Sequence, residues 1–130
     1  MEEIYVVTTK GIIKKSENSG DYIREISTKE DLEELIERMP YIPTIQAPNS
    51  RARKELYQLS MNEYDDVEWV KIIKSVHLRM EDSRYEEFEP EYAEKAKEFL
   101  HKEFSVRYHI PPEDVDAYIH ETLEKQLKEF

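Results

Sequence analysis

Apolar and polar residues alternate in two different ways along the chain, and the change falls near residue 26. Before it, short runs of β-branched and aromatic residues, such as IYVVTT at 4–9 and YIREI at 22–26, predict two or three strands separated by polar turns. After it, apolar residues recur at helical spacing. This pattern predicts a mainly α fold, a compact bundle of about five helices preceded by a short two- or three-stranded β segment. We expect an N-terminal β segment at 1–26 and a helical domain at 27–130.

The first two predicted helices have clear start signals. Ser27 and Glu30 have the spacing of a capping box, so the first N-cap is expected at Ser27. The second helix is expected at about 50–61, with Asn49 or Ser50 as its cap. The positions of this second helix expected to face inward are Ala52, Leu56 and Leu59.

Three further helices are expected along the rest of the chain. The third, at 65–80, is apolar around much of its circumference, so its tryptophan, Trp69, is expected in the core. The fourth begins at Pro90 and the fifth at Pro112, because proline suits the first turn of a helix. The expected inner face of the fifth helix consists of Val115, Tyr118, Ile119, Thr122, Leu123 and Leu127.

The N-terminal β segment needs a partner surface, because two or three isolated strands are only marginally stable in water. It can pack on the helices, pair with a second copy in a homodimer, or add to the sheet of another protein. Tyr5, Val6 and Val7 are the predicted partner-pairing strand.

Charge limits the possible partners. The chain has 130 residues, with 19 Lys and Arg against 30 Asp and Glu, for a net charge of −11. Affinity for DNA depends mainly on cations that neutralise phosphates, so a broad nucleic-acid surface is unfavourable here. Residues 51–80 are the exception, with six Lys and Arg against five Asp and Glu.

Three cations, Arg51, Arg53 and Lys54, crowd the first turn of the second predicted helix. Cations at this end oppose the helix dipole, whereas an external anion such as a phosphate would be favoured there. The alternative is an ordinary solvated helix face whose cations are balanced by nearby acids.

Several functional classes lack their usual residues. The chain has no cysteine, which excludes disulfides, thiol catalysis and cysteine zinc sites. Two glycines are too few for a phosphate-binding glycine loop, and Glu98 with His101 is a single helical pair where di-iron bundles need two. We therefore expect no enzyme activity, no catalytic or metal site and no cofactor. No apolar run approaches the roughly 18 residues of a membrane span, and the acidic N-terminus is unlike a signal peptide, so a cytoplasmic protein without membrane contact is expected.

A helix-turn-helix is one interpretation of the joint between the last two predicted helices. The fifth helix opens with Glu113, Asp114 and Asp116, which would meet DNA phosphates with like charge. We therefore interpret the joint as a structural corner around Tyr108 and Ile110.

From residue 26 onward, the order of segments resembles the C-terminal helical domain of CarD-like bacterial transcription regulators. The likeness lies in ISTKEDLEELIERMP, RARKELYQLS, VEWVKIIKSVHLR and EYAEKAKEFLHKEFSVRYHIPPEDVDAYI. The 26 N-terminal residues of this chain are too few for the family's full N-terminal β barrel. Ser50 stands where the family often carries a tryptophan that wedges into the minor groove.

The resemblance implies a non-enzymatic accessory protein of transcription. It implies that the N-terminal domain binds the RNA polymerase β subunit and that the helical domain contacts promoter DNA. Arg51, Arg53 and Lys54 match the family's basic residues, and Arg79 is expected to join them as a DNA-phosphate contact. The alternative hypothesis is a protein–protein interaction module or homodimeric adaptor without nucleic-acid contact.

Overall fold

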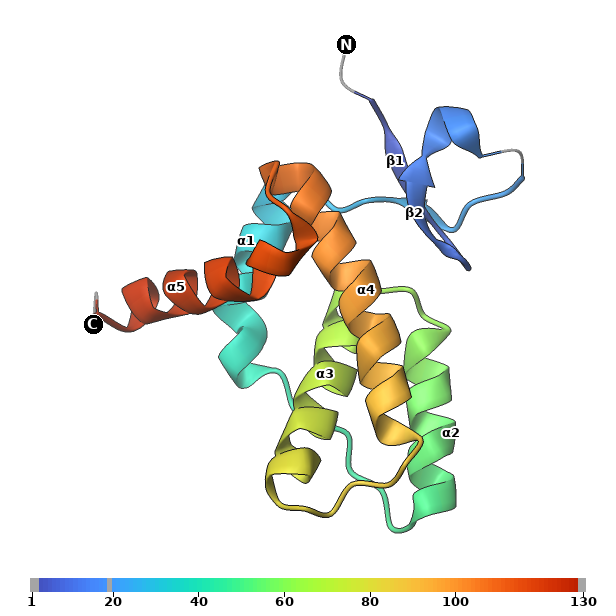
Figure 1. Cartoon of the computed structure of the whole chain (residues 1–130), viewed down its shortest axis with the longest axis vertical. Coiled ribbons are helices and arrows are strands. Elements are labelled where there is room, and N and C mark those ends of the chain that lie inside the picture. The colour runs from blue at the N-terminus through green and yellow to red at the C-terminus, as the bar shows by residue number, and fades with distance from the viewer. Residues whose placement is uncertain (1–2, 19, 129–130) are drawn as a thin grey trace. The chain divides into compact units, whose positions relative to one another are not determined.

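The structure, a computed structural model, describes residues 3–18 and 20–128, and for 122–128 the backbone alone. It is 63% helical, so within the described residues the prediction of a mainly α fold with five helices and a small β segment is confirmed (Figure 1). The strands are β1 (Tyr5–Thr8), β2 (Gly11–Lys14) and β3 (Arg24–Glu25). The helices are α1 (Lys29–Arg38), α2 (Ser50–Met61), α3 (Asp66–Glu81), α4 (Glu89–Tyr108) and α5 (Val115–Lys128).

The residues group into two compact units. Residues 1–38 and 101–130 form the sheet unit, which contains the strands, α1, α5 and the end of α4. Residues 39–100 form the three-helix unit, which contains α2, α3 and the first part of α4. The predicted domain boundary between residues 26 and 27 differs from this grouping and stays a prediction.

The strand order of the antiparallel sheet is β2-β1-β3. A tight turn joins β1 to β2, and Gly11 at its end adopts a φ of 144°, a conformation that side chains disfavour. Because β1 is the central strand, β2 and β3 already pair with its two edges. The prediction that Tyr5, Val6 and Val7 pair with a partner does not fit this topology, and the side chains of Val6 and Val7 are fully buried.

A buried glutamate of α4 holds the connection between β3 and α1 within the sheet unit. Oε2 of Glu103 accepts hydrogen bonds from Nη1 of Arg24 and from the Ser27 N–H, each at 2.8 Å. The Arg107 guanidinium donates to the carbonyl oxygens of Ser27, at 2.6 Å, and Ile26, at 3.1 Å. Two residues of α4 thereby bind both the N–H and the carbonyl oxygen of Ser27.

These contacts explain where α1 begins. Lys29 is the first residue of α1, and the hydroxyl of Thr28 accepts a hydrogen bond from the Asp31 N–H at 3.1 Å. Thr28 is therefore the cap, one residue later than the predicted Ser27. The first turn could not start earlier because the Ser27 N–H and carbonyl bind Glu103 and Arg107.

The joint between α4 and α5 has the contacts of a structural corner. The ring of Tyr108 lies 5.7 Å from that of Phe104 and 4.9 Å from that of Tyr118. The hydroxyl of Ser105 donates to the carbonyl of Ile110 at 2.5 Å, which satisfies a backbone acceptor at the turn. A 3₁₀ turn at Pro112–Asp114 precedes α5, so this α-helix starts at Val115 rather than at the predicted Pro112.

Val115 and Ile119 of α5 are buried as predicted, and α5 contacts α1. The predicted inner side chains of Thr122, Leu123 and Leu127 lie outside the described residues.

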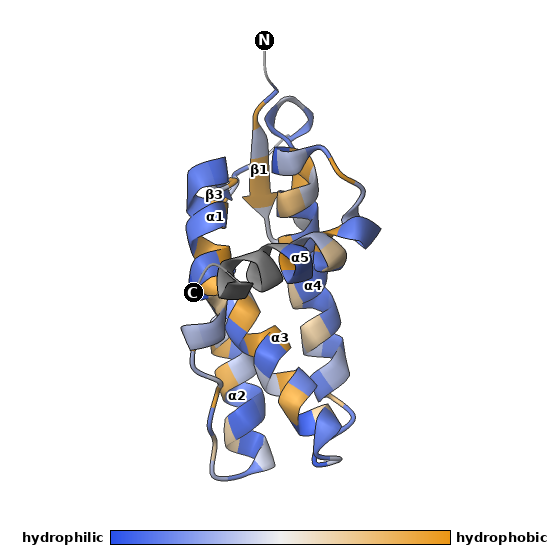
Figure 2. Ribbon diagram, turned by 90° about the vertical axis from the view of Figure 1, so that its left-hand side faces the viewer, coloured by the Kyte–Doolittle hydropathy of each residue, from blue (hydrophilic) through white to orange (hydrophobic). Residues whose placement is uncertain are grey.

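Trp69 is the centre of the three-helix unit. It is fully buried on α3, and its ring stacks on that of Phe99 of α4 at 5.0 Å, so the prediction of a core tryptophan is confirmed. Figure 2 shows apolar positions recurring along α3. On α2, Tyr57 is the buried residue and Leu59 is 61% exposed, so the prediction that Leu59 faces inward is wrong. A buried tyrosine is possible there because its hydroxyl has a hydrogen-bond partner, Glu89.

The segment between α1 and α2 is held against α3. Nζ of Lys74 donates to the carbonyl oxygens of Met39, at 2.8 Å, and Ile42, at 2.6 Å. The Ile45 N–H donates to the hydroxyl of Ser75 at 2.8 Å. These bonds position the chain where it enters α2.

Left-handed residues other than glycine follow three of the helices. Tyr64 after α2, Ser83 after α3 and His109 after α4 have φ values of 51°, 55° and 56°. In the part of the chain that the structure describes, no helix is both long enough and apolar enough to cross a membrane.

Candidate nucleic-acid interface

The first turns of α2 present two exposed cations. Asn49 caps the helix, and its side-chain oxygen accepts a hydrogen bond from the Ala52 N–H at 2.9 Å. Arg51 and Lys54 are three residues apart and therefore lie on one face of the helix. Both side chains are exposed, that of Arg51 to 92%. The cap thus fixes the start of α2 and, with it, the direction in which these two cations project.

The contacts of these two cations are weak ones. Nε of Arg51 lies 3.6 Å from a carboxylate oxygen of Glu55, and an exposed ion pair of this kind contributes little stability. Nζ of Lys54 lies 5.8 Å from the centre of the Phe88 ring, at the outer limit of a cation–π contact. Both side chains can therefore turn toward an external anion at small cost.

Arg53 has a different position. It is only partly exposed, and its Nη2 donates to the carbonyl of Ala47, at 3.2 Å, in the segment that enters α2. Its guanidinium therefore helps to hold the segment that enters α2. Of the three cations expected to form a cluster, only Arg51 and Lys54 are exposed.

Arg79, the fourth predicted phosphate contact, points into the three-helix unit. Its Nε donates to Oε1 of Glu89 at 2.8 Å, and its Nη2 donates to the carbonyl of Arg84 at 2.7 Å. The Arg79 side chain is 22% exposed and that of Glu89 is fully buried. Its guanidinium neutralises an internal carboxylate, so the structure does not bring Arg79 together with Arg51 and Lys54.

The Glu89 carboxylate is the centre of a polar cluster that the sequence did not reveal. Its Oε1 also accepts a hydrogen bond from the Tyr57 hydroxyl at 2.7 Å, and its Oε2 accepts one from the Glu86 N–H at 2.7 Å. Burial alone would raise the pKa of Glu89, but the hydrogen bonds from Tyr57, Glu86 and Arg79 outweigh it and lower the pKa. Burial, followed by the bond to Glu89, raises the pKa of Tyr57. The cluster is therefore an ionised carboxylate held by a neutral tyrosine and a cation.

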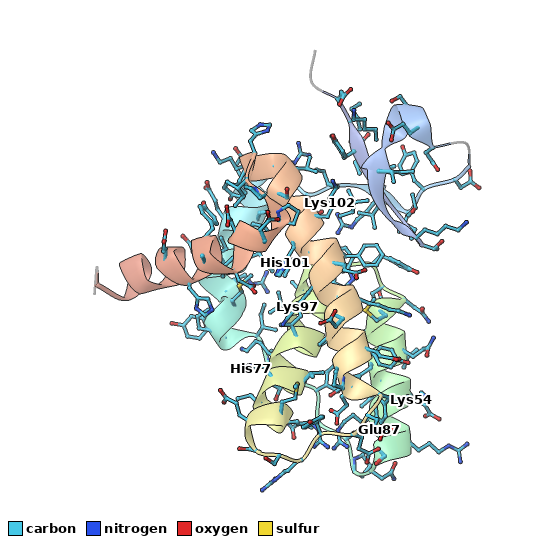
Figure 3. All side chains as sticks on the ribbon, in the orientation of Figure 1. Lys54, His77, Glu87, Lys97, His101 and Lys102 are labelled. Atoms are coloured by element: carbon cyan, nitrogen blue, oxygen red, sulfur yellow. The ribbon has the colours of Figure 1, made fainter. Side chains whose placement is uncertain are left out.

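The loop between α3 and α4 brings carboxylates to the start of α2. Glu86 accepts a hydrogen bond from the hydroxyl of Ser50, the first residue of α2. Figure 3 shows Lys54 and Glu87 at the same end of the three-helix unit, in agreement with the contact between Lys54 and Phe88. Phe88, one of two aromatic residues in this loop, is the signal in the sequence that the loop packs on a helix.

A shallow depression of about 570 Å³ adjoins these cations. It is lined by Arg51, Lys54, Glu55, Gln58 and Leu59, and its surface is mainly apolar. The methylene groups of Arg51 and Lys54 border it, while their charged ends reach solvent. The depression is shallow and mainly apolar, so it would not enclose a small ion.

The predicted single helical pair of Glu98 and His101 has an ordinary structural setting. Nε2 of His101 lies 3.0 Å from Oδ1 of Asp116 on α5, and Glu98 is exposed. Among the described residues, no three His, Asp or Glu side chains are grouped as a metal ion requires.

The sequence was compared with known proteins, and it matches neither a protein-family model nor a curated protein.

Proposed function

We propose that this protein is a non-enzymatic accessory protein of transcription, resembling CarD, which contacts the phosphate backbone of promoter DNA through Arg51 and Lys54. The observation that carries the proposal is the exposure of these two cations, side by side, at the capped start of α2. Phosphate contacts position a protein on DNA without reading bases, so little sequence preference is expected. Arg53 and Arg79 take no part, because carbonyl groups and Glu89 hold their guanidinium groups.

The test is binding of a forked promoter DNA followed by fluorescence anisotropy across a range of salt concentrations. Two phosphate contacts predict a log–log slope of about −2. The double change Arg51→Ala and Lys54→Ala should remove most of the binding.

The matched control is Lys95→Ala with Lys97→Ala, two exposed cations on α4 within the same unit. This control variant loses two positive charges, as the Arg51 and Lys54 variant does, and its affinity for DNA should be close to that of the unchanged protein. Equal losses in the two double variants would show that net charge, not this face of α2, governs binding. Absence of binding at low salt would remove the DNA role.

A second candidate function is protein binding through the sheet, with the RNA polymerase β subunit as the partner implied by the resemblance. The observation that favours it is a group of exposed apolar side chains in the N-terminal segment. Ile4 is 49% exposed, Tyr22 38% and Ile23 44%. The outer edges of β2 and β3, rather than β1, would then take the partner strand.

This candidate is tested by affinity purification of the tagged full chain from its native host. The variant Ile4→Asp with Ile23→Asp should lose the polymerase β subunit. The control Leu78→Asp, which changes an exposed leucine on α3, should retain it. Recovery of no polymerase subunit, with a monomer mass by light scattering, would contradict the sheet as a binding surface.

A further inference from the structure

The loop that joins α3 to α4 places acidic residues against the cationic end of α2. This acidic loop, Asp82–Phe88, carries the acids Asp82, Glu86 and Glu87 and one cation, Arg84. Glu86 accepts a hydrogen bond from the Ser50 hydroxyl, and the ring of Phe88 lies next to Nζ of Lys54. The face of α2 proposed to bind DNA therefore already has carboxylates of its own chain beside it.

The acidic loop is fixed by the core of the three-helix unit. Its backbone is held at the Arg84 carbonyl by Arg79 and at the Glu86 N–H by the buried Glu89. The Phe88 ring packs 6.2 Å from that of Tyr57 and 6.3 Å from that of Tyr92. The hydrogen bonds at residues 84 and 86 and the packing of the Phe88 ring therefore hold Glu86 next to Ser50.

A carboxylate at this place shares the chemistry of a DNA phosphate. Both are anions that accept hydrogen bonds from a hydroxyl and are favoured at the N-terminal end of a helix. A phosphate that approaches Arg51 and Lys54 would also come near Glu86 and Glu87, and like charges at short range repel. Loop and DNA therefore compete for the same end of α2.

We propose that the acidic loop is an intramolecular competitor of DNA: Glu86 and Glu87 weaken binding of the phosphate backbone to Arg51 and Lys54. This inference rests on the proposed DNA contact and adds a mechanism of regulation to it. It also explains how a cationic helix start is stable in the absence of DNA, because Glu86 supplies the negative charge that the helix dipole favours.

The experiment measures DNA binding by the variant Glu86→Gln with Glu87→Gln. Glutamine keeps the size of each side chain, and the backbone N–H of residue 86 still donates to Glu89. The dissociation constant for forked promoter DNA should fall by roughly fivefold or more, the usual lower limit of coupling between two sites.

The matched control is Glu63→Gln with Asp65→Asn at the opposite end of α2. Both side chains are exposed, and Asp65 makes no side-chain cap bond to α3. Each double variant raises the net charge of −11 by two. The 12 residues of α2 span about 18 Å, which exceeds the screening length of about 10 Å at 0.1 M salt. At that salt concentration the control should leave the dissociation constant unchanged.

A double-mutant cycle locates the effect. In a chain that also carries Arg51→Ala and Lys54→Ala, the loop variant should no longer strengthen binding, because the competing partners are gone. Equal strengthening by the loop variant and the control would overturn the competitor and leave the DNA role intact. Binding by the unchanged chain that the loop variant strengthens and the control does not would support both proposals. No binding by any variant would remove the DNA role and the competitor together.

Discussion

The carboxylate of Glu89 lies in the interior of the three-helix unit, where Tyr57, Arg79 and the Glu86 N–H donate hydrogen bonds to it. It joins residues from α2, α3 and the acidic loop through one buried group. A buried ion pair of this kind adds little net stability over apolar packing, but removal of one partner leaves the other charge uncompensated. The side chain therefore determines how α2 and the acidic loop are held together.

The first prediction concerns Glu89→Gln. The change leaves the Arg79 guanidinium without its anion, and the free energy of unfolding should fall by about 3 kcal/mol. Urea unfolding followed by circular dichroism measures it. The control is Glu91→Gln in the same first turn of α4, an exposed position where a change within about 0.5 kcal/mol is expected. Equal effects of the two changes would contradict the role given to Glu89.

The second prediction is the pH dependence caused by Glu89. Its pKa in the folded protein lies below the ordinary value of 4.5, so the unfolded chain takes up this proton more readily. The stability that Glu89 contributes is therefore present above pH 4.5 and is lost as pH falls through its lowered pKa. Acid unfolding curves should be less steep for Glu89→Gln below that pH than for the unchanged chain. Parallel curves would show that other carboxylates cause the acid unfolding.

Tyr57 gives the opposite dependence at alkaline pH. Its pKa in the folded protein is raised above the ordinary value of 10.0, so its contribution is complete below pH 10 and is lost as pH rises through the raised pKa. The variant Tyr57→Phe should be less stable at neutral pH, since Glu89 loses a donor, yet should lose less stability on further alkalisation.

At the scale of the element, the N-cap of α2 precedes the two cations proposed to contact DNA. The Asn49 side chain binds the Ala52 N–H and so fixes the turn from which Arg51 and Lys54 project. The third prediction is that Asn49→Ala lowers the free energy of unfolding by about 1 kcal/mol, whereas Asn49→Ser, another good cap, retains most of it. Thermal unfolding compares the two. A loss as large with serine as with alanine would mean that the cap bond is not the cause.

The elements whose signals are local were predictable from the sequence. The second helix was expected at about 50–61 and lies at Ser50–Met61, and the burial of Trp69 followed from the apolar pattern around it. These features depend on spacing within one segment, which periodicity describes.

The features that were predicted wrongly depend on contacts with residues far along the chain. Tyr57 replaces Leu59 on the inner face of α2 because its hydroxyl meets Glu89, 32 residues further on. The first cap moves from Ser27 to Thr28 because Glu103 and Arg107 bind the Ser27 backbone. Spacing within a segment contains no information about such contacts.

The candidate site was predictable only in part, for the same reason. Arg51 and Lys54 are exposed as a phosphate contact requires, but Arg79 pairs with a glutamate beyond the next loop. The sequence pattern predicts which cations lie on a helix, but it does not predict which of them forms an ion pair with a buried carboxylate.

At the scale of the whole molecule, a net charge of −11 would oppose the DNA binding proposed for Arg51 and Lys54. The fourth prediction is that affinity for DNA stops rising as salt is lowered. At 0.01 M salt the screening length is about 30 Å, so distant acidic residues repel the DNA as well. The log–log plot of affinity against salt should therefore bend downward from its slope of about −2 at the dilute end. A straight line throughout, measured by anisotropy from 0.01 M upward, would show that the distant acids have no influence.

Tyr64, Ser83 and His109 follow three helices and adopt the left-handed conformation, in which glycine is strained less than any residue with a side chain. Each such residue costs about 1 kcal/mol relative to a relaxed backbone. The chain contains only Gly11 and Gly20, and neither lies at these positions. The ring of Tyr64 also packs 5.8 Å from that of Phe99, so glycine at residue 64 would remove an aromatic contact. Glycine at residues 83 and 109 offers a route to a more heat-resistant protein that leaves Arg51, Lys54, Glu86 and Glu87 unchanged.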